Sequence, residues 1–201
     1  MIPGPAVPDR PRLRVVIAED AVLLREGLRR VLTDAGLEVA GTAGDAEQLL
    51  SLVTLLHPDV VLTDIRMPPT QTTEGLEAAV DIRRRWPGTA VIVLSQHVET
   101  EHLFELLAGD PRGIGYVLKE RVADIAQFTA AIHRVAAGES VIDPQVVSRL
   151  VARPRVSAER IRDDRLAQRV VRIGVGAADA GIDHGIDARG RLIPQQLHAN
   201  V

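Results

Sequence analysis

The chain contains no cysteine among its 201 residues. This excludes disulfide bonds, thiolate metal sites and cysteine nucleophiles, and it fits a reducing compartment. The sequence also has no uninterrupted apolar run of membrane-spanning length, and residues 1–12 are rich in proline rather than resembling a signal peptide. We therefore expect a cytoplasmic protein without a membrane partner.

Lysine is nearly absent, because Lys119 is the only one among 24 basic residues. The net charge of −3 argues against a polyanion-binding surface spread over the whole molecule, and 46% apolar residues suffice for a substantial core. Residues 1–151 hold 15 basic and 21 acidic residues, whereas residues 152–201 hold 9 and 6. This change of charge coincides with Arg153-Pro154-Arg155, where we expect a boundary.

Short apolar runs alternate with helical patterns five times along the chain. The expected strands are Leu13–Ala18, Leu37–Ala43, Val60–Asp64, Ala90–Ser95 and Gly115–Leu118. The expected helices are Val22–Leu32, one capped by Asp45 that runs to Leu56, Glu74–Trp86, Glu99–Ala108 and Val122–Ala137. Such alternation predicts an α/β fold, a doubly wound five-stranded parallel sheet with helices on both faces. Asp143-Pro144 then has the pattern of an N-cap followed by proline, and it predicts a connector helix over Gln145–Ala152.

Polar side chains follow four of the five expected strands. Glu19-Asp20 ends the first, Asp64 the third, Ser95 the fourth and Lys119 the fifth. In open α/β sheets, ligands bind outside the carboxyl ends of the strands. We therefore expect three carboxylates, a hydroxyl and an ammonium group to converge at one edge of the sheet.

Carboxylates crowded at one edge repel one another unless a cation lies among them. Oxygen ligands without histidine or cysteine suit Mg²⁺, which commonly shares its coordination shell with phosphate oxygens. Lys119 would supply a compact charge on a flexible stem. The pattern therefore predicts a site for a metal ion and a phosphoryl group, with Asp64 as the reactive residue.

The motifs at the strand ends, taken in order, resemble those of a known protein family. Glu19-Asp20, Asp64 within Leu-Thr-Asp-Ile-Arg-Met-Pro, Ser95 and Tyr116-Val-Leu-Lys119 resemble the receiver domain of two-component response regulators. The resemblance covers about residues 12–137. The segments Val-Ile-Ala-Glu-Asp and Leu-Ser-Gln-His-Val-Glu, together with residues 138–153, are most similar to the NarL/FixJ branch. Members of this branch normally end in a LuxR-type helix-turn-helix.

The resemblance implies a role for each matching residue. Asp64 would accept a phosphoryl group from a phosphohistidine on a sensor histidine kinase, and Lys119 would pair with the phosphoryl oxygens. Mg²⁺ would be held by Asp20, Asp64 and the backbone carbonyl of Arg66, with Glu19 acting through a metal-bound water. Ser95 and Tyr116 would form the switch. The changed surface would lie on the fourth helix, fifth strand and fifth helix, where a homodimer could form.

The expected organisation has four parts: an N-terminal tail (1–11), the receiver domain (12–137), a connector helix (138–153) and an atypical tail (154–201), either disordered or a truncated output region. Five glycines interrupt the tail, so we expect no helix-turn-helix and no sequence-specific DNA binding without a complete output domain.

A stand-alone receiver that acts through protein contacts is an alternative function. A second is a Mg²⁺-dependent phosphatase using Asp64, but Arg66 occupies the position of its general acid. We expect a phosphoacceptor rather than a turnover enzyme.

Overall fold

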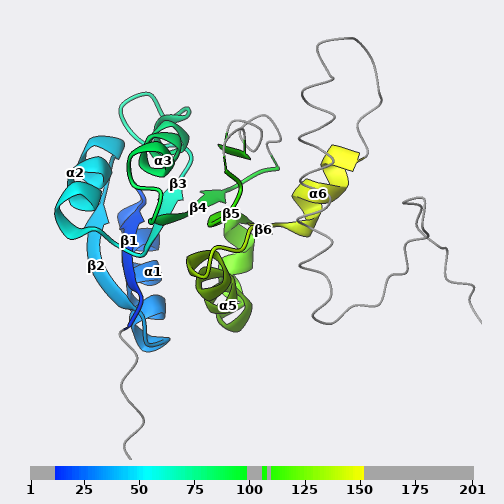
Figure 1. The fold of residues 1–201 in the computed structure, drawn as a ribbon, viewed down its shortest axis with the longest axis horizontal. Coiled ribbons are helices and arrows are strands. Elements are labelled where there is room, and N and C mark those ends of the chain that lie inside the picture. Colours follow the sequence, from blue (N-terminus) through cyan, green and yellow to red (C-terminus); the bar gives the residue numbers. More distant parts are fainter. Residues whose placement is uncertain (1–11, 99–105, 108–109, 152–201) are drawn as a thin grey trace, which may run out of the picture.

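A six-stranded parallel sheet forms the centre of the protein in a computed structural model, which describes residues 12–98, 106–107 and 110–151. The strands are β1 (Arg14–Ala18), β2 (Glu38–Ala43), β3 (Val60–Asp64), β4 (Ala90–Ser95), β5 (Ile114–Leu118) and β6 (Val141–Ile142). The helices are α1 (Val22–Asp34), α2 (Ala46–Leu56), α3 (Glu74–Arg85), the 3-10 helix η1 (Lys119–Ala123), α5 (Ile125–Ala136) and α6 (Pro144–Val151). The strand order is β2-β1-β3-β4-β5-β6, and helices cover both faces (Figure 1). The predicted doubly wound α/β fold is confirmed.

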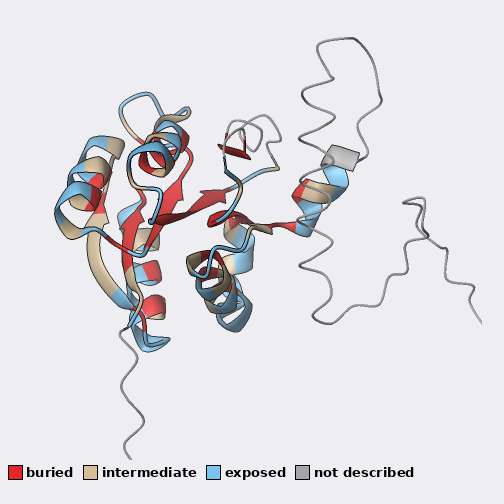
Figure 2. Cartoon of the chain, viewed as in Figure 1, coloured by how far each residue is buried: buried red, intermediate tan, exposed pale blue. Residues whose placement is uncertain are grey.

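The central strands are buried on both faces, which explains their unbroken apolar runs. Every residue of β3, β4 and β5 is buried, and Figure 2 shows these strands in red at the centre of the molecule. On one face, β-strand side chains pack with α1 and α5 through Leu28, Leu32, Phe128 and Ile132. On the other face they pack with α2 and α3 and with Val146 of α6. Within the described part of the chain, no helix combines the length and apolar character needed to cross a membrane.

Helix α2 begins and ends as its sequence predicts. The Asp45 side chain accepts a hydrogen bond of 2.8 Å from the Gln48 backbone N–H, which is one of the free donors of the first turn. At the other end, His57 adopts a left-handed backbone with φ of 45°, and Pro58 follows. The chain then enters β3, the strand that ends in Asp64.

The expected fifth helix, Val122–Ala137, is wrong at its start. Residues 119–123 form η1, and α5 begins only at Ile125. Asp124 causes the break, because its carboxylate accepts a 3.1 Å hydrogen bond from the Gln127 N–H and so caps a new helix.

The sheet has one strand more than the five predicted. The additional strand β6 is only two residues long, so it carries no periodic pattern, and it pairs with Gly115 and Tyr116 of β5. The expected fourth helix, Glu99–Ala108, lies mostly outside the described residues; Leu106 and Leu107 are described, helical and buried. Residues 1–11 and 154–201 also lie outside, so the division into four parts stays a prediction.

Helix α6 is attached to the segment that follows β5. The Asp143 carboxylate caps α6 by accepting a 2.9 Å hydrogen bond from the Gln145 N–H, as predicted, and it forms a 3.0 Å ion pair with Arg121 of η1. Gln145 also donates a 2.9 Å hydrogen bond to Glu120. The two residues after Lys119 therefore both hold the connector helix against the receiver domain.

Gly75, at the start of α3, packs directly against the backbone of β3. A β-carbon at this position would overlap the carbonyl oxygen of Asp64 and lie 2.9 Å from Thr63 Oγ1. The Gly75 N–H donates a 2.9 Å hydrogen bond to the Ile65 carbonyl. Glycine therefore permits the close approach that fixes the backbone of Asp64.

We expect Gly75→Ala to lower the free energy of unfolding by about 3 kcal/mol or more, because the clash is with backbone that cannot rotate away. Gly27→Ala is the matched control, since Gly27 is exposed in the middle of α1 with no atom within 4 Å of an added β-carbon. That change should stabilise the protein by about 1 kcal/mol through helix propensity. Urea denaturation measures both, and equal effects of the two substitutions would contradict the packing described for Gly75.

Candidate functional site

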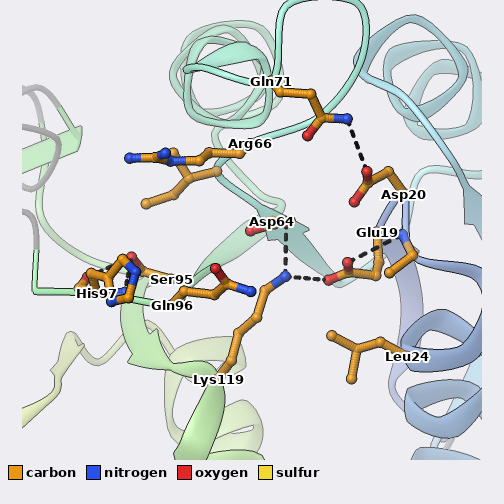
Figure 3. Close-up of a pocket in the computed structure, with 12 residues that line it drawn as sticks. Glu19, Asp20, Leu24, Asp64, Arg66, Gln71, Ser95, Gln96, His97 and Lys119 are labelled. Carbon is orange, nitrogen blue, oxygen red and sulfur yellow. Dashed lines mark hydrogen bonds and ion pairs between the residues drawn. The ribbon is translucent and has the colours of Figure 1, made fainter.

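The carboxyl ends of β1, β3, β4 and β5 surround a cavity of about 260 Å³. Five of the seven site residues predicted from the sequence line it with their side chains, and Arg66 lines it as well (Figure 3). These five are Glu19, Asp20, Asp64, Ser95 and Lys119. The parallel register explains the convergence, because Asp64 lies opposite Leu94 and Ser95 lies opposite Leu118.

Lys119 lies between two of the acids. Its Nζ is 2.8 Å from Asp64 Oδ2, to which it donates a hydrogen bond, and 2.8 Å from Glu19 Oε2. The side chains are 14% exposed for Lys119, 9% for Asp64 and 1% for Glu19. Because water screens these charges poorly, the ammonium group interacts strongly with both carboxylates.

Burial has opposite consequences for the two ends of this contact. Burial alone would lower the pKa of Lys119, but the hydrogen bond to Asp64 and the contact with Glu19 outweigh it and raise that pKa. Burial raises the pKa of Glu19, and the nearby Asp64 charge adds to this, although Lys119 opposes both. Both pKa values are thus raised, but for different reasons: Lys119 faces two acids, whereas Glu19 is buried and faces one base and one acid.

Three carboxylates are close enough to share one metal ion. Glu19, Asp20 and Asp64 each offer an oxygen, and these oxygens all lie within 4.8 Å of one another. Glu19 Oε2 is buried and has no hydrogen-bond partner of good geometry within the described chain, despite its ion contact with Lys119. An all-oxygen set with spare acceptor capacity fits a hard divalent cation such as Mg²⁺.

Two contacts orient the Glu19-Asp20 pair, and sequence reasoning missed both. Gln71, on the segment between β3 and α3, donates a 2.9 Å hydrogen bond from Nε2 to Asp20 Oδ2. Arg25 of α1 donates a 2.5 Å hydrogen bond to the Glu19 carbonyl. Gln71 is 51 residues from its partner, and no motif marks it. Arg25 lies one turn into α1, and only knowledge of how the preceding loop folds would have identified it.

The two expected switch residues lie in different surroundings. Ser95 is buried at the cavity, and its hydroxyl donates a 2.6 Å hydrogen bond to the His97 carbonyl. Tyr116 is fully buried, belongs to the core cluster that also contains Leu106 and Leu107, and does not line the cavity. The structure therefore places Ser95 with the acids and Tyr116 behind them in the core.

The comparisons with known proteins agree with this geometry. The family model of the response regulator receiver domain matches residues 15–132, which is more than half of the chain. This chain belongs to that family. Receiver domains act in two-component phosphorelays, so the regulator function expected from the sequence is confirmed, and the family is one of signalling proteins.

Individual relatives identify the branch. The uncharacterized transcriptional regulatory protein YxjL of Bacillus subtilis (strain 168) is 30% identical over 80% of this chain and 71% of that protein. The transcriptional regulatory protein DegU of Brevibacillus brevis is 36% identical over 70% of this chain and 57% of its own length. A LuxR-family response regulator from Aurantimonas sp. SI85-9A1 matches in structure with a TM-score of 0.58 and 26% identity, over 68% of this chain and 94% of that one. The resemblance to the NarL/FixJ branch is confirmed.

The single lysine allows a direct test of the charge arrangement in this receiver domain. With lysine labelled at the ε-carbon, NMR should show one side-chain signal, whose pKa lies above the ordinary value of 10.5. Asp64→Asn should lower that pKa, because the amide removes the hydrogen-bonded charge partner. The raised pKa also means that stability from Lys119 is present below pH 10.5 and is lost as the pH rises through the folded-state value.

Asp34→Asn is the control for this titration, since Asp34 is an exposed acid at the end of α1, 3.9 Å from Arg30. It should leave the Lys119 signal unchanged. An equal pKa in wild type and Asp64→Asn would show that Lys119 is not paired with Asp64 in solution.

Proposed function

We propose that Asp64 accepts a phosphoryl group from the phosphohistidine of a sensor histidine kinase. The observation that carries the proposal is Lys119 Nζ held 2.8 Å from Asp64 Oδ2, in a cavity that two further carboxylates line. An Asp64 oxygen would bond to phosphorus as the bond from phosphorus to the histidine nitrogen breaks, and the imidazole would recover a proton from solvent. Lys119 would then move its hydrogen bond from the carboxylate to a phosphoryl oxygen.

The same residues would hold Mg²⁺. Asp20 and Asp64 would ligate the ion directly together with the backbone carbonyl of Arg66, and Glu19 would hold a metal-bound water. When bound, the ion neutralises charge on the phosphoryl oxygens. The support is the cluster of three acids within 4.8 Å, whose mutual repulsion a divalent cation would relieve.

Ser95 and Tyr116 would transmit the event. The Ser95 hydroxyl would leave the His97 carbonyl and donate to the new phosphoryl group, and the Tyr116 ring would move within the core cluster that contains Leu106 and Leu107. Such a movement would change the surface formed by β5, α5 and the expected helix Glu99–Ala108, through which we propose that a homodimer forms.

Transcriptional control is the output that we propose. YxjL and DegU are both named as transcriptional regulatory proteins, and this chain spans 71% and 57% of their lengths. DNA recognition would require a complete output domain, and action by this chain through protein contacts is the alternative. A titration of the phosphorylated protein against promoter and scrambled DNA separates the two. The proposed place of action is the cytoplasm.

We expect Asp64→Asn to abolish phosphorylation by acetyl phosphate, because the amide oxygen is a poor nucleophile and the charge partner of Lys119 is lost. Labelling of wild type should require Mg²⁺ and disappear with a chelator. Asp34→Asn, which removes an exposed acid, should be labelled like wild type. Phosphorylation of Asp64→Asn at the wild-type level would remove the proposal.

We expect Ser95→Ala to be phosphorylated but to self-associate about tenfold less readily, because a hydrogen bond to a charged group contributes on the order of 1.5–3 kcal/mol. Ser51→Ala, which changes an exposed serine of α2, is the matched control and should behave as wild type. Analytical ultracentrifugation with and without phosphoryl donor measures the effect. If phosphorylation-dependent association were equal in Ser95→Ala and wild type, Ser95 would have no part in the switch.

A further inference from the structure

The segment between β3 and α3 is held in place by Glu74, the first residue of α3. Its carboxylate accepts hydrogen bonds of 2.9 Å from the backbone N–H groups of Thr70 and Thr72, and another from the Thr70 hydroxyl. The Gln71 N–H donates a 3.0 Å hydrogen bond to the Met67 carbonyl. These contacts fix the turn that carries Gln71 to the cavity.

Gln71 has a backbone conformation that its residue type rarely adopts. Its φ is 60°, in the left-handed region that favours glycine and asparagine. Among the described residues, the side-chain hydrogen bond of Gln71 goes to Asp20 Oδ2 at 2.9 Å, across 51 positions of sequence. Figure 3 shows Gln71 above the acid cluster, with the second oxygen of Asp20 on the side of Asp64. The hydrogen bond of its side chain to Asp20, and not its backbone conformation, therefore accounts for a glutamine at this position.

We propose that Gln71 is a positioning residue for the divalent cation, and that it acts by binding one oxygen of Asp20 so that the other faces Glu19 and Asp64. This inference rests on the proposed metal site. The amide suits the task because it donates a directed hydrogen bond and adds no charge, so it orients Asp20 without competing with the cation. A lysine in its place would neutralise the acid instead.

The Glu74 carboxylate, which accepts the hydrogen bonds of this turn, resists protonation. Hydrogen bonds, first of all that from the Thr70 hydroxyl, lower the pKa of Glu74 to about 2. Glu74 therefore keeps its charge at pH values at which an ordinary exposed glutamate would take up a proton. Deleting the Gln71 side chain would leave the acids present but Asp20 free to turn toward solvent.

The test is a calorimetric titration with Mg²⁺ alone, in the absence of any phosphoryl donor. Gln71→Gly should bind Mg²⁺ about tenfold more weakly than wild type, the lower end of the range for residues that orient metal ligands. Glycine also relieves the left-handed backbone, so the thermal midpoint of the metal-free protein should not fall. Weaker binding by a protein that is no less stable separates positioning from a merely structural role.

His57→Gly is the matched control. His57 is the other described non-glycine residue with positive φ, it is exposed at the end of α2, and it does not line the cavity. This change should relieve the same kind of backbone strain and leave Mg²⁺ binding unchanged. Gln71→Asn gives a second variant that tolerates the left-handed backbone but is one methylene too short to reach Asp20, and it should also bind Mg²⁺ more weakly.

Wild-type Mg²⁺ affinity in Gln71→Gly and Gln71→Asn, together with lost binding in Asp20→Asn, would overturn this inference and leave the proposed function standing. Failure of the wild-type protein to bind Mg²⁺ would overturn the metal site and the inference with it. Weakened binding in both Gln71 variants but not in His57→Gly is the result that we expect.

Discussion

The contact of Lys119 with Asp64 and Glu19 is the interaction on which the proposed chemistry of this receiver domain depends. One ammonium group lies 2.8 Å from both carboxylates, and a third acid, Asp20, completes the cluster. Burial raises the pKa of Glu19, whereas the hydrogen bond to Asp64 contributes to the raised pKa of Lys119 despite burial. The site thus has negative charge in excess of its base, and a divalent cation would offset this excess.

The position of Lys119 also connects the site to the rest of the fold. Lys119 begins η1, and the next two residues, Glu120 and Arg121, hold helix α6 through Gln145 and Asp143. A displacement of the lysine toward a phosphoryl oxygen would therefore act on a segment that is attached to the connector helix. The parallel sheet makes this compact arrangement possible, because it brings the carboxyl ends of four strands to one edge.

The parts predicted from sequence are those encoded by local pattern. Asp64 and Lys119 were identified because unbroken apolar runs locate the buried strands, and the end of a parallel strand is a defined place in the fold. Gln71 and Arg25 were missed because they act through contacts that only the folded chain brings together. Strand β6 was missed because two residues carry no periodicity. The start of α5 was misplaced because Asp124 caps the helix and so starts it later than the apolar pattern indicates.

The most direct test of the account is to locate the phosphoryl group on the protein. After phosphorylation by acetyl phosphate with Mg²⁺, reduction with borohydride converts an acyl phosphate into a stable alcohol, and peptide mass spectrometry identifies the residue that carried it. We expect modification at Asp64, with Glu19 and Asp20 unmodified. Modification at either of these two acids, with Asp64 intact, would contradict it.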